Sequence, residues 1–418
     1  MSIQWFDQEV AGTHTAAMSV GDACRSFWGI SAELNSMISA RARRGASDST
    51  PRHRQMLGLR HDRPDDPLDA NADTKRGLAR GAEPLSGEAG GFTLDPCIVA
   101  ERRPLIEVMG GGAGAAAAVL PLALVQLQPG EDAAGNRRAA EAWLERALQP
   151  AAGTPTPRLL MLPEIWNAPY AAERFAAYAE PVPEPGHLLA EGPSPSLAMV
   201  ARLARRHGVS VIAGSIPERG ADGRLYNTAT VIDADGRLRA KHRKLHRFDV
   251  DVPGGIRFRE SDSLTGGDRL TVLDGAGDPL ATGLAEPPNL GLLICYDIRF
   301  PELALLMQQQ LGATVIACPA AFNTTTGPRH WHLLMRARAV DTQCFVLACS
   351  SARPEHGEGY PSYGHSLVVD PWGAVIAEAG IGEQVLHAEL DLAEVGRARQ
   401  AIPTGDQRRG DLYRLEPA

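Results

Sequence analysis

Apolar residues follow a regular spacing only from about residue 118 onward. Short apolar runs predict strands there, and they cover 120–128, 158–164, 209–218, 225–233, 289–295, 313–322, 344–351, 365–373 and 384–391. Apolar positions at helical spacing predict helices, and they cover 136–148, 194–208, 301–312 and 327–342. Strands alternate with helices, and several strands are apolar throughout. We therefore expect an α/β fold whose sheet is covered by helices on one face and by an apolar layer on the other.

The first 117 residues show no such spacing. They are rich in Gly, Pro, Asp and Arg, as in "RPDDPLDANADTKRG", and such a segment buries too little apolar surface to offset its ordering entropy. We expect residues 1–117 to form a largely disordered, low-complexity arm and residues 118–412 to form one domain. The glycine cluster in "MGGGAGAAAA" is not followed by Lys-Ser/Thr, so we do not expect a phosphate-binding loop there.

Composition narrows the class of protein. The 418 residues are 44% hydrophobic and 22% charged with a net charge of −8, which is a globular balance without the basic stripe of nucleic-acid-binding proteins. The six cysteines show no CxxC spacing, which favours free thiols in a reducing compartment. No apolar run reaches the ~18 residues of a membrane helix, and Asp7 and Glu9 stand where a signal peptide is basic. We expect a cytoplasmic protein that binds neither nucleic acid nor membrane, with organelle import by the arm left open.

Four residues are candidates for a catalytic role. Glu164 ends "LLMLPE" and Cys295 ends "LGLLIC", whereas Lys244 and Glu260 lie in "HRKLHRFDVDVPGG" and "IRFRESDSL". Three of the four lie at or near strand ends or in the following loops, and ligands of α/β sheets collect beyond the carboxyl ends of strands.

One Cys, one Lys and one Glu suffice for amide hydrolysis without a metal. A carboxylate can accept the thiol proton as the sulfur attacks a carbonyl carbon. A lysine ammonium and a backbone N–H, here that of Tyr296 directly after Cys295, can stabilise the oxyanion that forms. The same carboxylate can then protonate the leaving amine and activate water against the thioester.

Each of these residues also has an ordinary structural interpretation. A cysteine at the end of an apolar strand is usually a buried core residue. A glutamate after proline is usually solvated, and a lysine in "HRKLH" is usually one charge on an exposed ribbon. Spacing alone does not decide between these interpretations.

Three segments together resemble the signature blocks of the nitrilase (carbon–nitrogen hydrolase) superfamily: "LLMLPEIWNAPY", "KHRKLHRFDVDVPGGIRFRESDSL" and "LGLLICYDIRFPELALLM". The resemblance covers about 118–412 and implies a four-layer αββα sandwich. It assigns Cys295 as the nucleophile, Glu164 as the general base and acid, and Lys244 as the oxyanion-stabilising lysine. Glu260 matches a second glutamate that supports the other three.

Within the superfamily, "AFNTTTGPRHWHLLMRARAVDTQ" is most similar to the omega-amidase branch. This likeness implies hydrolysis of short dicarboxylate monoamides, such as 2-oxoglutaramate and 2-oxosuccinamate, to the 2-oxo acid and ammonia through a cysteine thioester. The alternatives are a deaminated-glutathione amidase or another amidase of the superfamily, a thiol protease pairing Cys295 with a histidine, and a non-catalytic binding scaffold.

Such a substrate carries a free carboxylate, for which an Arg is a suitable partner. Arg299 is the candidate, and an ion pair with Glu302 or Asp297 is its structural alternative. Further candidates for the pocket wall are Tyr170, Phe322, Asn323 and Thr326.

We expect no cofactor and no metal. His330 and His332 flank Trp331, but residues two apart on a helix do not share a face. His242 and His246 lie in a predicted extended ribbon without the adjacent Glu of a zinc protease. The resemblance also implies a homo-oligomer, most simply a dimer.

Overall fold

The computed structural model describes residues 119–189, 193–251, 257–275, 284, 287–355 and 359–417. The expected arm over 1–117 lies outside the described residues. Among the described helices, none is both long and apolar enough to span a bilayer.

Two six-stranded sheets form the centre of the domain. The first has the order β14-β1-β2-β3-β4-β5 and the second the order β13-β12-β11-β10-β9-β8. The first sheet contains β1 (Val119–Gln126), β2 (Leu159–Met161), β3 (Ser210–Arg219), β4 (Leu225–Ile232), β5 (Leu238–Arg243) and β14 (Gln384–Asp391). The second contains β8 (Val272–Leu273), β9 (Leu290–Leu292), β10 (Val315–Ala320), β11 (Phe345–Ser350), β12 (Leu367–Val369) and β13 (Val375–Glu378). Strands β1-β2-β3 and β9-β10-β11 are parallel and the other pairs are antiparallel.

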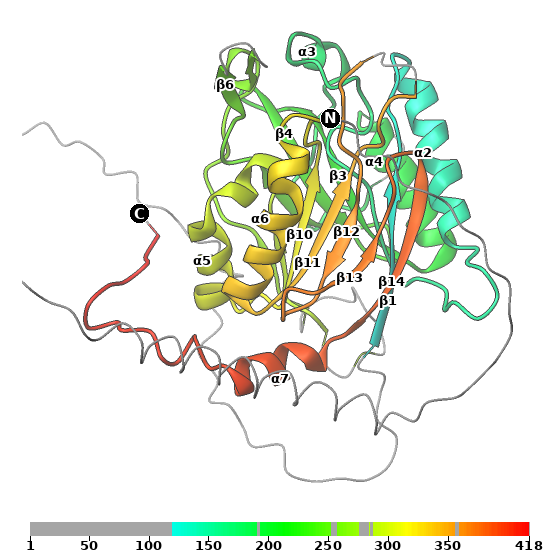
Figure 1. Cartoon of the computed structure of the whole chain (residues 1–418). Coiled ribbons are helices and arrows are strands. Elements are labelled where there is room, and N and C mark those ends of the chain that lie inside the picture. The colour runs from blue at the N-terminus through cyan, green and yellow to red at the C-terminus, as the bar shows by residue number, and fades with distance from the viewer. Residues whose placement is uncertain are drawn as a thin grey trace, which may run out of the picture. The chain divides into compact units, whose positions relative to one another are not determined.

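Helices cover the outer face of each sheet. Figure 1 shows α5 (Pro301–Leu311) and α6 (Gly327–Thr342) on one side, and α2 (Ala133–Ala147) and α4 (Pro195–His207) on the other. The remaining elements are short or peripheral: η1 (Ala172–Arg174), α3 (Phe175–Tyr178), the ribbon β6 (Asp249–Asp251) and β7 (Arg257–Arg259), η2 (Glu260–Asp262), η5 (Cys295–Arg299) and α7 (Ala393–Ala401). This arrangement confirms the expected four-layer αββα sandwich.

Three apolar cores separate the four layers. Successive side chains of a strand point to opposite faces, so Val125 of β1 packs toward α2 and α4 whereas Leu124 packs between the sheets. A third core lies between the second sheet and α5 and α6, and Met335 of α6 belongs to it. The apolar layer expected on the inner face of the first sheet is therefore the second sheet.

Most predicted elements are present. The ranges predicted for α6 and β14 contain those helix and strand residues. Ser194 stands at the N-cap position of α4, but its hydroxyl donates to the Pro181 carbonyl and not to the first turn of the helix. The Glu180 carboxylate accepts hydrogen bonds from the Ser196 N–H (2.9 Å) and hydroxyl (2.6 Å) in the first turn of α4.

Candidate active site

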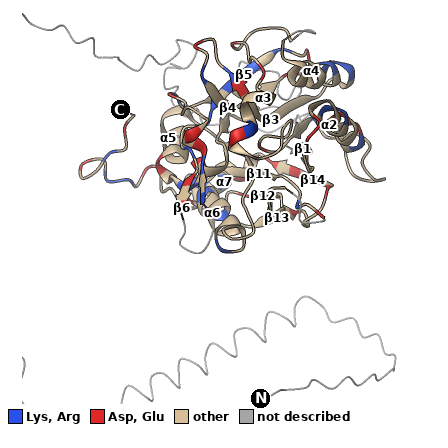
Figure 2. Cartoon of the chain, turned by 90° about the horizontal axis from the view of Figure 1, so that it is seen from above, with Lys and Arg blue, Asp and Glu red and all other residues tan. Residues whose placement is uncertain are grey.

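The folded chain brings together Glu164, Lys244 and Glu260, which are far apart in the sequence. The Lys244 Nζ lies 2.9 Å from Glu164 Oε1 and 2.8 Å from Glu260 Oε1. All three side chains are buried. Figure 2 shows acidic and basic residues meeting among the strand ends between β3, β4 and α5, inside the outer helices. One cation between two carboxylates is the electrostatic centre of this site.

Glu164 follows β2, and its two carboxylate oxygens have different surroundings. Oε1 accepts hydrogen bonds from Lys244 and from the side-chain amide of Asn227 (2.8 Å). Oε2 has no hydrogen-bond partner of ordinary geometry among the described residues. Burial raises the pKa of Glu164, which Lys244 and the thiol of Cys295 lower in part. Oε2 is therefore the atom available to take a proton.

A strained turn presents the Glu164 side chain. Ile165 has φ +50°, which is unusual for a β-branched residue. The turn is held because Ile165 N–H donates to the Ser215 hydroxyl (3.1 Å) and Ser215 N–H donates to the Pro163 carbonyl (3.1 Å). Gly214 permits this close approach: it has φ +58°, and a Cβ there would lie 2.1 Å from Pro163 O.

We expect Gly214→Ala to destabilise the protein by about 2 kcal/mol or more and to lower activity, because the methyl group would displace the turn that carries Glu164. Gly208→Ala is the matched control. Gly208 has φ +62°, and a Cβ there would meet no atom within 4 Å, so this change tests only the cost of the backbone angle. Thermal unfolding and amide hydrolysis measure both variants. Equal losses in the two variants would contradict the steric explanation.

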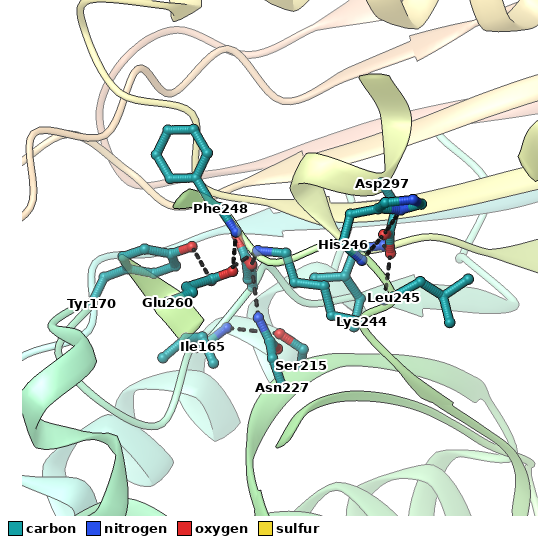
Figure 3. A network of polar contacts seen from close by, with 12 residues as sticks. Ile165, Tyr170, Ser215, Asn227, Lys244, Leu245, His246, Phe248, Glu260 and Asp297 are labelled. Carbon is teal, nitrogen blue, oxygen red and sulfur yellow. Dashed lines mark hydrogen bonds and ion pairs between the residues drawn. The ribbon is translucent and has the colours of Figure 1, made fainter. Parts of the chain in front are cut away.

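Lys244 follows β5 and remains positively charged. Burial alone would lower the pKa of Lys244, but Glu164 and Glu260 outweigh it, so the pKa lies well above its usual range. Glu260 is fixed in turn by Tyr170, whose hydroxyl donates to Oε1 (3.2 Å), and by the Phe248 N–H, which donates to Oε2 (2.7 Å). Figure 3 shows Tyr170 and Phe248 reaching Glu260 beside Lys244.

Cys295 begins η5, directly beyond β9, and is almost completely buried. Its φ is +46°, and such strain in a non-glycine residue is typical of functional sites. Burial and the charge of Glu164 raise the pKa of the Cys295 thiol well above its usual range, whereas Lys244 lowers it. The next residue, Tyr296, has its N–H in the first turn of η5, where helical amides lack intrahelical partners.

Asp297 links the loop that follows Lys244 to the turn that carries Cys295. Its Oδ1 accepts hydrogen bonds from the backbone N–H (2.8 Å) and the Nδ1 (3.0 Å) of His246, and its Oδ2 accepts from the Ile294 N–H (3.1 Å). His242 Nε2 lies 3.5 Å from Oδ2. Burial raises the pKa of Asp297, but its contacts with His242 and His246 hold it well below its usual range. Figure 3 shows Asp297 beside His246 and Leu245.

Arg299 lies beside the site without a carboxylate partner among the described residues. Its guanidinium lies 4.8 Å from the ring centre of Phe322, and its Nη1 is 3.1 Å from His330 Nδ1. Burial lowers the pKa of Arg299. The structural alternative, an ion pair with Glu302 or Asp297, is not formed in the described part of the chain.

The other residues proposed for the pocket differ in their contacts. The ring centre of Tyr170 lies 4.5 Å from that of Tyr360, and the Tyr170 hydroxyl contacts Glu260. Asn323 instead organises the turn before α6, because its Oδ1 accepts from the Thr326 N–H (2.9 Å) and hydroxyl (3.2 Å). Asn323 and Thr326 thus have a local structural role in addition to any contact with substrate.

Sequence analysis missed three residues of this site: Asn227, Asp297 and Tyr360. Burial, followed by the charges of Cys295 and Glu164, raises the pKa of the Tyr360 hydroxyl, so this group lies near the reacting residues. Asn227 left a signal in the sequence, since it is an amide within the buried strand "LYNTATVID". The sequence suggests Asp297 only as an ion-pair partner of Arg299, and nothing in its spacing indicates its contact with His246.

The chain is similar in sequence and in structure to several known proteins. The family model of carbon-nitrogen hydrolases matches residues 121–400. The chain is 43% identical over 294 residues to "Omega-amidase, chloroplastic" of Arabidopsis thaliana, covering 70% of this chain and 73% of the relative. It is 42% identical over 296 residues to "Omega-amidase NIT3" of Saccharomyces cerevisiae, covering 70% and 94%. The crystal structure of Saccharomyces cerevisiae Nit3, described as a member of branch 10 of the nitrilase superfamily, aligns with a TM-score of 0.60 at 38% identity, covering 71% of this chain and 100% of that chain.

Proposed function

The chain belongs to the carbon–nitrogen hydrolase family, and from this premise we propose that it is an omega-amidase. It hydrolyses the terminal amide of short dicarboxylate monoamides such as 2-oxoglutaramate, and it releases ammonia and the 2-oxo acid. The relatives named omega-amidase support the substrate class. The observation that carries the proposal is that Lys244 contacts both Glu164 and Glu260 in a buried site. The Cys295 thiol lies close enough to Glu164 to lower the pKa of that carboxyl.

The first half of the reaction forms a thioester. The Cys295 sulfur attacks the amide carbon while its proton passes to Glu164, whose Oε2 is unpaired among the described residues. The carbonyl oxygen becomes an oxyanion, which the Lys244 ammonium and the Tyr296 N–H stabilise. Glu164 then gives the proton to the amide nitrogen, the C–N bond breaks, and ammonia leaves.

The second half regenerates the thiol. Glu164 removes a proton from water, the hydroxide adds to the thioester carbon, and the same two donors stabilise the second oxyanion. The C–S bond then breaks, and the sulfur recovers its proton from Glu164. Glu260 holds the Lys244 ammonium in position. Asp297 holds the loop that follows Lys244 through the His246 N–H.

A thiol protease is the weaker alternative. The groups that set the Cys295 pKa include Glu164 and Lys244, and no histidine of the described residues is hydrogen-bonded to its sulfur. A substrate panel tests the proposal: ammonia release from 2-oxoglutaramate and from butyramide, and release of the cysteinylglycine dipeptide from deaminated glutathione, each against Cys295→Ala. Highest kcat/KM on 2-oxoglutaramate is the expected result. Preference for deaminated glutathione, or release by Cys295→Ala, would overturn it.

Arg299 is proposed to bind the free carboxylate of the substrate. Replacing it by Met is expected to raise KM for 2-oxoglutaramate about 10-fold or more, since a charge-assisted hydrogen bond is worth ~1.5–3 kcal/mol. Butyramide has no carboxylate, so its KM should change little. Steady-state kinetics on both substrates measures the effect, and an equal loss for both would show that Arg299 supports the fold of the site instead.

The pH dependence of kcat/KM should show an acidic limb set by Glu164. The base must be ionised to accept the thiol proton, and burial raises the pKa of Glu164. Activity is therefore present above that pKa and falls as the pH drops through it, at a pH above the range in which an ordinary glutamate titrates. Rate measurements across the acidic range, with circular dichroism to show that the protein stays folded, locate the limb. A limb within the ordinary glutamate range would contradict Glu164 as the base.

The proposal includes a homodimer in a reducing, cytoplasmic environment. The four cysteines within the described residues are free thiols. Apolar side chains are exposed on α6, where Leu333 is 64% and Val340 51% accessible, and we propose this helix as part of the dimer interface. Light scattering coupled to size-exclusion chromatography measures the mass, and a monomer at micromolar concentration would contradict the dimer.

A further inference from the structure

Two histidines and a glutamate converge between α6 and the second sheet, and no hydrogen bond of the described residues joins their side chains to the catalytic residues. His332 Nε2 and His365 Nδ1 each lie 2.9 Å from Glu378 Oε1. One ligand atom from each of the three residues lies within 4.8 Å of the other two. The three side chains are partly accessible to solvent. Neither the proposed reaction nor the pocket candidates use this cluster.

The three residues come from three separate elements. His332 lies in α6, His365 precedes β12, and Glu378 ends β13. In the sequence, His332 stands two residues from His330, which instead contacts Arg299. The two histidines of α6 therefore point to different neighbours, and the partners of His332 come from later in the chain.

The backbone of His365 is held in a strained conformation. Its φ is +59°, which is uncommon outside glycine although more frequent for histidine than for most residues. Its N–H donates to the Gly380 carbonyl (3.0 Å), and its carbonyl accepts from the Trp331 indole N–H (2.6 Å). Strain that the surrounding hydrogen bonds maintain is typical of functional positions. The imidazole is thus directed toward Glu378 by a fixed backbone.

We propose that His332, His365 and Glu378 form a binding site for a divalent transition-metal ion of the zinc class. Two imidazoles and one carboxylate are a donor set that suits Zn²⁺ and similar ions. Ligand atoms around a tetrahedral ion with bonds of ~2.0–2.1 Å lie roughly 3.4 Å apart, so small movements of the side chains convert the present contacts into coordination. Water or another ligand would complete the coordination shell.

A single oxygen of Glu378 faces both imidazoles, since Oε1 lies 2.9 Å from His332 Nε2 and 2.9 Å from His365 Nδ1. His207 and Glu145 form a comparable pair elsewhere on the surface, at 2.9 Å. That pair has only one imidazole, so it provides a natural comparison for the three-residue cluster.

A bound ion would tie α6 to the turn before β12 and to the end of β13. The same turn already packs on α6, because a Cβ at Gly327 would lie 2.2 Å from the ring of Tyr363. Gly327 begins α6, directly after the pocket segment that contains Phe322 and Asn323. The ion would therefore stabilise a helix adjoining the proposed substrate pocket without contacting the reacting atoms.

The test is zinc binding by the full chain with Cys295→Ala, which removes the catalytic thiol as a competing ligand. Competition with a chromophoric chelator measures the affinity, and Co²⁺ substitution reports coordination through its visible absorption bands. The ligand variants are His332→Gln, Glu378→Gln and His365→Asn, the last because asparagine tolerates the left-handed backbone. His207→Gln is the matched control. Residues 1–118 also contain histidines and cysteines, but they are the same in every variant.

The expected result is one equivalent of zinc whose affinity falls about tenfold or more in each ligand variant and is unchanged in His207→Gln. Zinc should also raise the thermal midpoint of the parent but not of the ligand variants, since binding to the native state alone stabilises it. Circular dichroism checks that each variant is folded. If the parent binds no zinc at micromolar free concentrations, or if folded ligand variants bind as the parent does, the proposal is wrong.

Discussion

Replacing Glu164 by glutamine is expected to lower kcat on 2-oxoglutaramate by about 10³-fold or more while changing KM little. Glutamine has the shape of glutamate and can still contact Asn227, but it accepts no proton. General acid–base catalysis contributes ~10²–10⁴-fold to a single step, and Glu164 is proposed to act in both halves of the reaction. Single-turnover measurements would show whether thioester formation is already blocked.

Glu180→Gln is the matched control for this change. Glu180 is also buried, and burial raises the pKa of Glu180 as it does that of Glu164. However, it contacts Ser196 at the start of α4 and none of the reacting groups. This variant should lose stability and keep its kcat. Retention of activity by Glu164→Gln would contradict the amidase mechanism and favour a base other than Glu164.

Replacing Lys244 by methionine is expected to abolish activity and to lower the free energy of unfolding by about 3–5 kcal/mol. Removing one partner of a buried ion pair leaves uncompensated charge in the interior, and Lys244 is the cation between Glu164 and Glu260. Without it, the pKa of Glu164 should rise further in the folded state, because Lys244 lowers it in the parent. A carboxyl pKa that is raised in the folded state means that stability is retained at low pH and lost as the pH rises. Urea unfolding at acidic and at neutral pH should therefore show the larger deficit at neutral pH.

Lys241→Met provides the comparison. Lys241 lies on β5 close to Lys244 in the sequence and also contacts two glutamates, with Nζ 2.9 Å from both Glu184 and Glu218. It has no contact with the catalytic carboxylates among its hydrogen bonds. We expect a loss of stability with kcat preserved. If Lys241→Met lost as much activity as Lys244→Met, a general effect on the first sheet would explain both.

The sequence predicts the long elements of this fold better than the short ones. The structure forms α6 and β14 over the same residues that the sequence predicts for them, 327–342 and 384–391. Strand β13, "VIAE", is short and half-exposed, and α7 buries only Val395 and Ala398. Such elements depend on their neighbours more than on their own periodicity. Pairing of the last strand, β14, with the first, β1, is likewise a property of the closed fold.

The residues of the site likewise differ in how well the sequence predicts them. Glu164, Lys244, Glu260 and Cys295 stand in segments whose residue order resembles a known family, so the sequence alone is enough to single them out as candidates. Asn227 and Asp297 act through contacts between distant loops. The cluster of His332 with His365 and Glu378 arises from three elements that the sequence does not place together. Contacts of this kind depend on tertiary packing, which residue spacing does not encode.

The high pKa of Cys295 has a consequence for how selectively this protein reacts. Peroxides and simple alkylating agents attack sulfur in its anionic form, and in the resting protein burial and Glu164 both oppose that form. The sulfur gains its reactivity only as its proton moves to the neighbouring carboxylate, in the presence of a carbonyl that fits between the cysteine and the lysine. We therefore expect the resting thiol to react slowly with oxidants and simple alkylating agents that do not fit the site.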